Sequence, residues 1–225
     1  MKVVCISDTH GMHSRLEMPP GDLLVHAGDF SWQGRPREVM GFLEWFEAQP
    51  YRYKAFIAGN HEVTFEKYPE TVREWVRPFL SDRLCYLQDS GVTFEGTSIY
   101  GSPWQPWFCD WAFNLRTAAE LHVKWSRIPD GTDVLITHGP PHMYGDWVDR
   151  DENVGCRELL RKVLQVKPQL HVYGHIHEGY GMYSLPHTVL VNASSTDDAY
   201  YAIRKPIVME LAHGSERVRH DEVPA

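Results

Sequence analysis

The 225-residue sequence has no long hydrophobic run, and this absence limits where the protein can work. A transmembrane helix needs about 20 consecutive apolar residues, and no segment approaches that length. The opening residues, MKVVCISDTHG, have neither the apolar length nor the cleavage pattern of a secretory signal. We therefore expect a cytoplasmic protein that makes no membrane contact.

Cysteine pairs and clusters of basic residues are also missing. The four cysteines lie far apart, without a Cys-x-x-Cys pair, and read as isolated thiols. Lys and Arg number 22 against 30 Asp and Glu, which gives a formal net charge of −8. Because long nucleic acids are bound through clustered Lys and Arg, we expect no such partner. A small phosphorylated substrate is still compatible with this charge if metal ions supply positive charge locally.

The sequence has no internal repeat, low-complexity tract or linker that would mark a domain boundary. With 43% hydrophobic and 23% charged residues, the composition is that of an ordinary globular protein with a substantial core. We expect one domain over residues 1–212 and a polar C-terminal tail over residues 213–225.

Short apolar runs alternate with helical patterns, which predicts a layered α/β domain. Five strand-like runs are each followed closely by Gly, Asp or His, and they cover residues 2–7, 23–27, 54–58, 132–138 and 170–174. In open α/β sheets the loops at the carboxyl ends of the strands line the binding crevice. Five segments should therefore deliver polar residues to one edge. The later runs VTFEG, SIYGS, HTVLVN and PIVMEL predict further strands in a second sheet.

Two segments have the apolar spacing of amphipathic helices that face a core. In residues 36–48 the apolar positions are Val39, Phe42, Leu43 and Phe46. In residues 155–166, before the stop at Pro168, they are Cys156, Leu159, Leu160, Val163 and Leu164.

The five strand ends carry the residues that indicate chemistry. They are Asp8 and His10 in SDTHG, Asp29 in HAGDF, Asn60 and His61 in AGNHE, His138 in THGPP, and His175 and His177 in GHIH. Carboxylate, imidazole and amide oxygen together suit Mn, Fe or Zn. Each motif alone has an ordinary interpretation; Asn60, for example, could cap a helix with Glu62 in its first turn. Their joint occurrence at five strand ends favours a metal centre.

The GHIH turn places two histidines one residue apart in a glycine-rich segment. Side chains at i and i+2 of a strand point the same way, but in such a turn they need not. The spacing alone therefore leaves three interpretations open: two ligands of one ion, one ligand for each of two ions, or polar residues of a turn.

As a set, these motifs resemble the calcineurin-like metallophosphoesterases. The flanking sequences HAGDFSWQG, IAGNHEVTF, GSPWQPWF, WAFN, DVLITHGPP and HVYGHIHEGYG are similar to the subgroup that contains the vertebrate brain-expressed metallophosphoesterase-domain proteins and microbial relatives. The resemblance covers about residues 1–192. It implies a two-sheet β-sandwich flanked by α-helices, with the active site at the carboxyl ends of the strands.

The resemblance also implies a site for two divalent or mixed-valence metal ions, namely Mn, Fe or Zn. By this likeness, Asp8, His10 and His177 hold the first ion, and Asn60, His138 and His175 hold the second, with Asp29 bridging both. A hydroxide that bridges the ions would attack phosphorus. His61 would protonate the leaving oxygen or stabilise its charge.

Two positions bear on whether this site is active. Some branches of the family have an Asp three residues after the bridging Asp, where it orients the catalytic histidine. This sequence has Trp32 there, which leaves the partner of His61 open, with the neighbouring Glu62 as a candidate whose reach the sequence does not fix. Some relatives have Gly in place of His175, which impairs the second metal site. Because His175 is present, we favour an active two-metal enzyme.

The Trp-rich segment 104–113 and a nearby histidine are candidate substrate contacts. Trp104 and Trp107 could stack on a base or an aromatic leaving group, or they could pack the rim of the domain. His142 is a further candidate for a substrate contact, with an exposed loop histidine as the alternative.

The resemblance implies a phosphoesterase that acts on phosphodiesters, including cyclic nucleotides as in class III cyclic nucleotide phosphodiesterases, and on monoesters. The first alternative is a nuclease or nucleotide phosphatase that uses the same dinuclear site. The second is a nucleotide-binding regulatory protein with residual activity, which missing ligands would favour.

Overall fold

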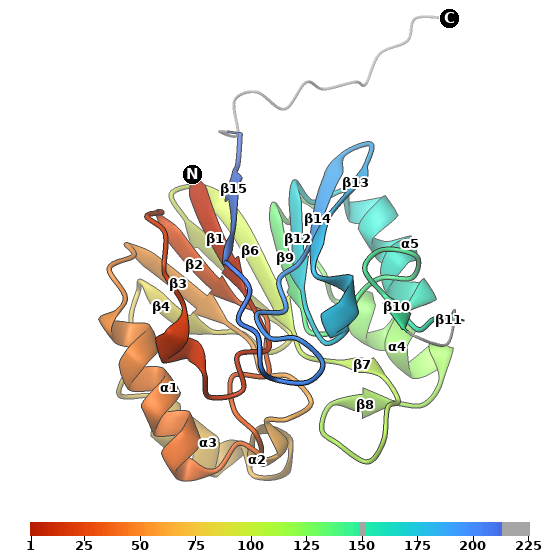
Figure 1. The fold of residues 1–225 in the computed structure, drawn as a ribbon. Coiled ribbons are helices and arrows are strands. Elements are labelled where there is room, and N and C mark those ends of the chain that lie inside the picture. The colour runs from red at the N-terminus through yellow and green to blue at the C-terminus, as the bar shows by residue number, and fades with distance from the viewer. Residues whose placement is uncertain (149–151, 213–225) are drawn as a thin grey trace, which may run out of the picture.

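A computed structural model describes residues 1–148 and 152–212, and two β-sheets form its centre (Figure 1). The first sheet has the order β15-β1-β2-β3-β4, and the second has the order β13-β14-β12-β9-β6-β5. The first comprises β1 (Lys2–Ile6), β2 (Leu23–His26), β3 (Tyr53–Phe56), β4 (Leu84–Tyr86) and β15 (Ile207–Glu210). The second comprises β5 (Ser90–Phe94), β6 (Thr97–Ser102), β9 (Val134–Thr137), β12 (Leu170–Tyr173), β13 (Gly181–Leu185) and β14 (Thr188–Asn192).

The strands that carry the predicted site run parallel within each sheet. In the first sheet, β1, β2 and β3 are parallel neighbours. In the second sheet, β12 pairs in parallel with both β9 and β14. Carboxyl ends of parallel neighbours lie at the same edge of a sheet, so the five predicted strands deliver their terminal loops to one end of each sheet.

One of the strands predicted for the second sheet lies in the first sheet. The run PIVMEL forms β15, which pairs antiparallel with β1 in the first sheet, so its expected place in the second sheet was wrong. The runs VTFEG, SIYGS and HTVLVN contribute to β5, β6 and β14 of the second sheet, as predicted. An apolar alternation reports that a strand is half-buried and does not specify the strand with which it pairs.

The two sheets pack face to face around a buried apolar layer. Val3, Cys5 and Val25 of the first sheet share this layer with Ile136 and Val172 of the second, and all five are fully buried. The alternate residues of β1 and β2 point to the opposite face, where Val4 and Leu24 join a second cluster beneath α1. Because both faces of these strands are covered, the strands read as continuous apolar runs.

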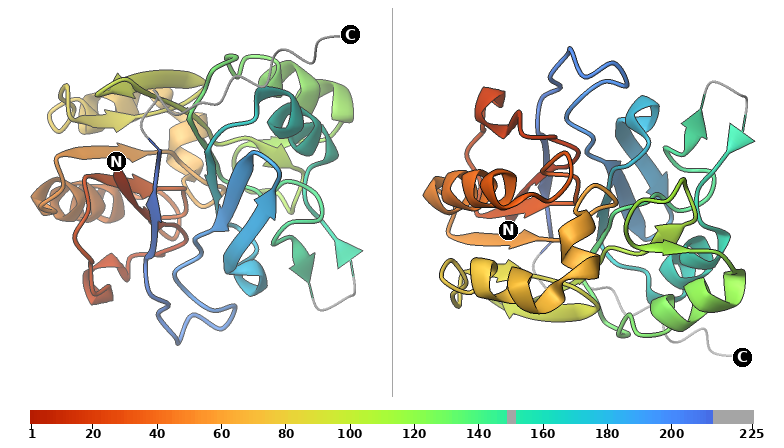
Figure 2. Two further views of the ribbon diagram at one scale, coloured as in Figure 1. Left: turned by 90° about the horizontal axis from the view of Figure 1, so that it is seen from above. Right: turned by 90° about the horizontal axis from the view of Figure 1, so that it is seen from below.

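Helices cover the outer faces of both sheets (Figure 2). On one side lie α1 (Pro36–Ala48), α2 (Val63–Lys67) and α3 (Pro69–Val76), and on the other α4 (Ala118–Trp125) and α5 (Arg157–Val166). The predicted helix 36–48 is confirmed, and its four apolar positions are fully buried. The second predicted helix begins at Arg157, with Cys156 as its cap. Leu164, expected to face the core, is 48% exposed because the buried stripe of α5 is narrow and centres on Leu159 and Val163.

The remaining elements are short and lie near the carboxyl ends of the site-bearing strands. They are η1 (His13–Arg15), η2 (His177–Gly179), the paired strands β7 (Gln105–Pro106) and β8 (Asn114–Leu115), and the paired strands β10 (Trp147–Val148) and β11 (Glu152–Asn153). The predicted tail 213–225 lies outside the described residues. Across residues 1–148 and 152–212, no helix is long and apolar enough to cross a membrane. The cytoplasmic location stays a prediction.

Candidate metal centre

The five strand ends meet where the two sheets approach each other. A bridge between Ser7, after β1, and Ser194, after β14, joins the sheets at this point. Three groups of side chains there could each hold a metal ion, because their ligand atoms lie within 4.8 Å of one another. The groups are Asp8, His10 and His177; His10, Asp29 and His61; and Asp29, His138 and His175.

The group formed by Asp8, His10 and His177, here called the first group, contains buried ring nitrogens without a hydrogen-bond partner in the described chain. His177 Nε2 lies 3.6 Å from Asp8 Oδ1. The Nδ1 of His177 donates a hydrogen bond to the carbonyl oxygen of Asp197 at 2.9 Å, so Nε2 is the nitrogen that would bind an ion once it has lost its proton. Both ring nitrogens of His10 are buried without a hydrogen-bond partner in the described chain. Buried nitrogens without partners are costly unless something else binds them, so this group fits a metal ion.

The group formed by Asp29, His138 and His175, here called the second group with Asn60 added, also consists of buried or half-buried side chains. His138 is fully buried, and its Nδ1 donates to the carbonyl oxygen of Ala27 at 2.9 Å. Its Nε2 lies 2.8 Å from Asn60 Oδ1 and 3.3 Å from Asp29 Oδ2. A carbonyl behind the ring fixes the tautomer that ligates metals in proteins. The second group therefore also fits a metal ion.

In the metal-free protein, each of the two groups has one ionised carboxylate and one protonated histidine. Burial alone would raise the pKa of Asp8, but the hydrogen bond and charge of His177 hold it well below its usual range. For Asp29, the charges of His138 and His61 overcome burial and likewise lower the pKa. The carboxylates in turn overcome the effect of burial on two histidines, and they raise the pKa of both His138 and His177 to about 9.

The other histidine of each group is neutral. Burial lowers the pKa of His10 to about 4 and that of His175 to about 3. Each group therefore contains a carboxylate, a histidine that holds a proton in the absence of metal, and a neutral histidine. A divalent cation could take the place of this proton, because it would pair with the same carboxylate and bind the nitrogen that the proton leaves.

The backbone at this site is in an unfavourable conformation. Asp8, His10, Asp29 and His175 have φ values of 51°, 43°, 56° and 66°, in the left-handed region that favours glycine. Such residues cost of order 1 kcal/mol each and cluster at functional sites. Gly174, which precedes His175, cannot be replaced by a larger residue without a clash, because a Cβ at this position would lie 1.9 Å from Asp8 Oδ2. These side chains are therefore held at the site by backbone conformations that lower the stability of the fold.

Glu62 is buried and fastens the loops that follow β2 and β3. Its carboxylate accepts hydrogen bonds from the backbone N–H groups of Asp29, Ser31 and Gly59 at 2.7–3.0 Å and from the Ser31 hydroxyl at 2.7 Å. Burial, together with the charge of Asp29, raises its pKa to about 8. Glu62 precedes α2, whereas Asn60 faces His138, so the capping alternative for Asn60 is wrong.

The orienting partner of His61 is a backbone carbonyl. His61 Nδ1 is 2.9 Å from the carbonyl oxygen of Trp32, so the ring donates to a main-chain group at the position where some relatives carry an Asp. All four of the short hydrogen bonds to Glu62 come from other residues, and none of the described contacts joins Glu62 to the His61 ring. The ring stacks obliquely against Trp111, with 4.2 Å between centroids. His61 Nε2 is thereby turned toward Asp29 Oδ2, at 3.9 Å.

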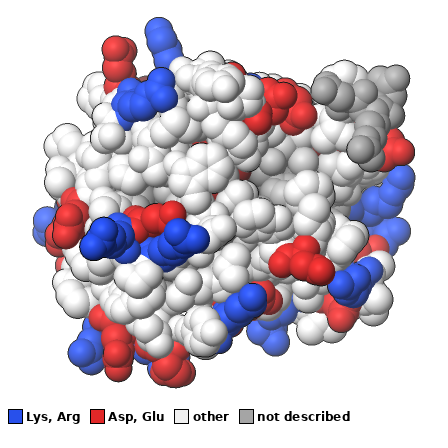
Figure 3. Space-filling view, turned by 60° about the horizontal axis from the view of Figure 1, so that its bottom comes forward, with Lys and Arg blue, Asp and Glu red and all other residues white. Residues whose placement is uncertain are grey.

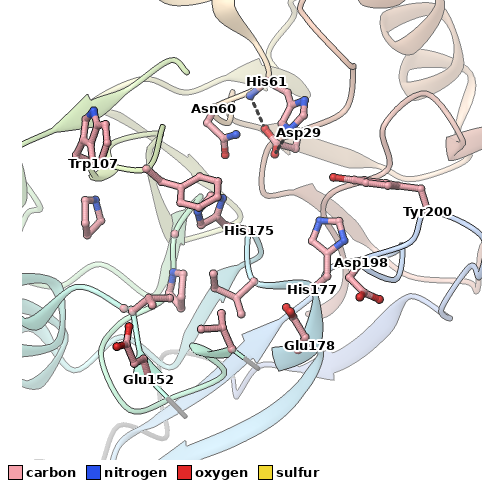
Figure 4. Close-up of a pocket in the computed structure, with 18 residues that line it drawn as sticks. Asp29, Asn60, His61, Trp107, Glu152, His175, His177, Glu178, Asp198 and Tyr200 are labelled. Atoms are coloured by element: carbon pink, nitrogen blue, oxygen red, sulfur yellow. Dashed lines mark hydrogen bonds and ion pairs between the residues drawn. The ribbon is translucent and has the colours of Figure 1, made fainter. Parts of the chain in front are cut away.

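A cleft of about 600 Å³ opens over the metal-ligand groups. Figure 4 shows His61, Asn60 and Asp29 at one side of it, His175 and His177 at its centre, and Trp107 at the far side. Four carboxylates line the cleft (Asp29, Glu152, Glu178 and Asp198), whereas none of the described lining residues is Lys or Arg. The space-filling view shows a hollow in a mostly uncharged face, with acidic side chains on its rim (Figure 3). Among the described lining residues, an anionic substrate would find no cation apart from protonated histidine and any bound metal.

The predicted substrate contacts divide between the cleft and the rim of the domain. Trp107 lines the cleft and is 48% exposed. Trp104 lies elsewhere: its indole N–H donates to Asp89 at 2.9 Å, and Lys124 Nζ is 3.6 Å from the ring centroid. His142 is also absent from the lining and lies 3.5 Å from Asp146. The structure therefore favours rim packing for Trp104 and places His142 outside the described lining of the cleft, so its substrate contact stays a prediction.

The sequence patterns did not identify the residues that arrive from the segment between β14 and β15. Tyr200 and Asp198 line the cleft, and the carbonyl of Asp197 holds His177. Ser194 donates to Asp8 Oδ2 at 2.9 Å. The segment reads as SSTDDAYY, an ordinary polar turn without metal-ligand spacing. Only the paired acids and tyrosines before a strand offered a signal, and such a signal is weak.

Comparison with known proteins identifies the family to which this chain belongs. A family model described as calcineurin-like phosphoesterase matches residues 1–179, and the chain belongs to this family. It is 47% identical over 231 residues to metallophosphoesterase domain-containing protein 1 of Homo sapiens and of Mus musculus, covering 93% of this chain and 71% of each relative. It is 37% identical over 220 residues to UPF0046 protein K07C11.7 of Caenorhabditis elegans, covering 94% of this chain and 75% of the relative.

Solved structures support the fold. The crystal structure of TT1561 of Thermus thermophilus matches with a TM-score of 0.63 and 12% identity, covering 86% of this chain and 88% of that chain. The family and subgroup inferred from the motifs are confirmed, as is the fold of two sheets flanked by helices. Family membership supports a metal-dependent phosphoesterase, and the Asp/His groups are compatible with divalent ions.

Proposed function

We propose that this protein hydrolyses phosphodiesters at a centre of two metal ions. The observation that carries the proposal is the position of Asp29, whose carboxylate lies within 4.8 Å of ring nitrogens of His138 and His175 in one group and of His10 and His61 in another. A carboxylate shared by two groups of ligands is what a bridging ligand requires. Bound ions would neutralise the phosphoryl oxygens and lower the pKa of a bound water, which supplies the nucleophile.

The residues divide between the two proposed ions as the two groups divide in space. Asp8, His10 and His177 would hold the first ion, while Asn60, His138 and His175 would hold the second. This assignment supports one interpretation of the GHIH turn, in which each histidine serves a different ion. The left-handed backbone of His175 turns its ring away from His177, which a regular strand would not do. Mn, Fe and Zn all suit this mixture of nitrogen and oxygen ligands.

His61 is proposed to act on the leaving oxygen. Its Nδ1–H is engaged by the Trp32 carbonyl, so Nε2 is the nitrogen that faces the cleft and exchanges a proton with substrate. The Trp111 ring against its face limits rotation of the imidazole. A protonated Nε2 would give its proton to the departing alkoxide, which would otherwise leave as a poor leaving group.

The charge of the cleft supports a phosphodiester over a phosphomonoester as the preferred substrate. A diester carries one negative charge, whereas a monoester carries up to two at neutral pH. Because the described lining has four carboxylates and no Lys or Arg, each further negative charge on the substrate increases repulsion. The same lining argues against long nucleic acids, and so against the nuclease alternative.

The apolar side of the cleft supports a substrate with a flat group, such as a cyclic nucleotide. Trp107 and Phe108 line this side and are 48% and 54% exposed. The Phe108 ring lies edge-on to the proposed ligand His175, with 5.4 Å between centroids. A base that stacked on either aromatic ring would keep its phosphate near the metal centre.

The test combines elemental analysis with a substrate panel. Protein stripped of metal is reloaded with Mn, Fe or Zn, and hydrolysis is compared for bis(p-nitrophenyl) phosphate, p-nitrophenyl phosphate, 3′,5′-cyclic AMP and an oligonucleotide. We expect two metals per chain and a higher kcat/KM for the diesters than for the monoester. One metal per chain without turnover would contradict the proposal and favour the regulatory alternative.

A further inference from the structure

Tyr200 lies in the cleft but has no role in the chemistry described so far. It belongs to the segment between β14 and β15, which loops over the lower end of the sheets in Figure 1. Its ring is edge-on to His10, with 4.9 Å between centroids, and edge-on to His177, at 5.4 Å. Trp32 packs against it at 4.8 Å. The ring is thus fixed beside the first group.

The backbone of this segment is fastened to the same group. The N–H of Tyr200 donates to the carbonyl of Asp197 at 3.1 Å, and this carbonyl also accepts the proton of His177 Nδ1 at 2.9 Å. The Arg204 guanidinium donates to the carbonyls of His177 at 2.8 Å and Thr196 at 2.6 Å. The position of Tyr200 is therefore tied to that of a proposed metal ligand.

Tyr200 also adopts an unfavourable conformation. Its φ is 59°, in the left-handed region where a residue with a Cβ costs about 1 kcal/mol. Glycine or asparagine would satisfy the turn at a lower cost. A large aromatic residue at such a position, in contact with the strained residue His10, indicates that the side chain has a function.

The phenol oxygen points into the cleft. Figure 4 shows it directed toward the side on which Asp29, Asn60 and His61 lie. Within residues 1–148 and 152–212, the structure gives this oxygen no hydrogen-bond partner, whereas the phenol groups of Tyr173, Tyr180 and Tyr183 each donate to a carbonyl. An O–H group held rigidly and left without a partner is ready to bind a ligand.

We propose that the Tyr200 hydroxyl donates a hydrogen bond to a non-bridging oxygen of the substrate phosphoryl group. The inference rests on the proposed phosphoesterase function and adds a substrate-binding residue to it. Because the described lining of the cleft has no Lys or Arg, the phenol is a neutral donor where other phosphate sites use a cation. A neutral donor suits the single charge of a diester and adds no charge to the group it packs against.

The test compares Tyr200→Phe with the matched control Tyr201→Phe. Phenylalanine keeps the ring packing on His10 and Trp32 and removes only the hydroxyl. Tyr201 is the next residue, is 82% exposed and is not among the described residues that line the cleft. For each variant we would measure the affinity of the metal-loaded protein for inorganic phosphate by calorimetry, kcat and KM on bis(p-nitrophenyl) phosphate, the metal content and the Tm.

We expect Tyr200→Phe to weaken phosphate binding and to lower kcat/KM by about 10-fold to 100-fold, as loss of a donor to an anionic oxygen does. Metal content and Tm should stay those of the wild type, and Tyr201→Phe should match the wild type throughout. Unchanged phosphate affinity in Tyr200→Phe would overturn the inference, as would loss of metal, because the residue would then act only through packing on its histidine neighbours. If the wild type hydrolyses no ester, the proposed function fails, but the ratio of phosphate affinities still tests Tyr200.

Discussion

The two groups of the metal centre are built in different ways, although their ligands are alike. The second group is supported by the sheets themselves: His138 is fully buried and donates to Ala27, the first residue after β2. The first group depends on a connecting segment, because His177 donates to Asp197 and Asp8 accepts from Ser194. A ligand supported by a sheet is held by long-range backbone pairing, whereas one supported by a loop depends on a few contacts. We therefore expect the first group to be the more easily perturbed.

The largest effect should come from Asp29→Ala, which removes the carboxylate proposed to bridge the two ions. Loss of this carboxylate leaves His10, His138 and His175 without their common neighbour. We expect metal content to fall below one ion per chain and kcat/KM to fall at least about 1,000-fold. Elemental analysis after gel filtration and assays on bis(p-nitrophenyl) phosphate measure both quantities.

The matched control for Asp29→Ala is Asp130→Ala, which removes an 82% exposed carboxylate whose side chain faces Lys162. It should leave metal content and turnover unchanged. If Asp29→Ala kept two ions per chain, Asp29 would not bridge, and the two groups would be independent sites.

His61→Ala should separate chemistry from metal binding. His61 faces the cleft and is oriented by Trp32, but it is not assigned to either ion. We expect kcat to fall about 100-fold to 10,000-fold, because the leaving oxygen loses its proton donor, while both ions stay bound. Unchanged metal-dependent hydrolysis would show that the mechanism is wrong.

The paired variants His175→Gly and His177→Gly test the division of the GHIH turn directly. His175→Gly should lower the affinity for the second ion, and His177→Gly should lower that for the first, each by about 100-fold or more. Titration of the metal-free variants with Mn, followed by calorimetry, would resolve one tight and one weak step in each case. Loss of the same step in both variants would mean that the two histidines serve one ion.

Metal uptake should depend on pH in the same way for both groups. Without metal, His138 and His177 have pKa values of about 9, and the proton on the ligating nitrogen must leave before an ion binds. The apparent affinity for each ion should therefore rise by about 10-fold per pH unit until the pH reaches these pKa values, and then level off. Mn titrations at several pH values measure this slope. If the affinity for one of the two ions did not change with pH, the two groups would not release a proton in the same way on binding metal.

Arg204→Ala is the smallest perturbation and tests the support of the first group alone. Its guanidinium donates to the carbonyls of His177, Thr196 and Ser194, and none of these contacts reaches the second group. We expect the affinity for the first ion to fall about 10-fold, as the loss of a residue that positions a ligand does. The second step should be unchanged. The control is Lys205→Ala at the neighbouring position, and an equal loss at both steps would contradict the proposed difference between the groups.

Much of the site was predictable because its residues follow strands directly. Apolar runs fix the position of a buried strand, and the next few residues must then lie at its carboxyl end. This reasoning brought together residues as distant as Asp8 and His177. The placement of Trp104 was beyond it, because whether an aromatic ring lines a cleft or packs a rim depends on neighbours such as Asp89 and Lys124, which arrive from other elements.

By itself, the sequence determined the α/β layering, the helix over residues 36–48 and the set of polar residues at five strand ends, because these follow from local periodicity and from where strands stop. Only the tertiary structure decided that β15 joins the first sheet, that the Trp32 carbonyl takes the place of an orienting carboxylate, and that Tyr200 reaches the cleft. These depend on pairing and packing between segments far apart in the chain, which no local pattern records. The difference in support between the second group, held by the sheets, and the first group, held by a connecting segment, also depends on contacts between distant segments.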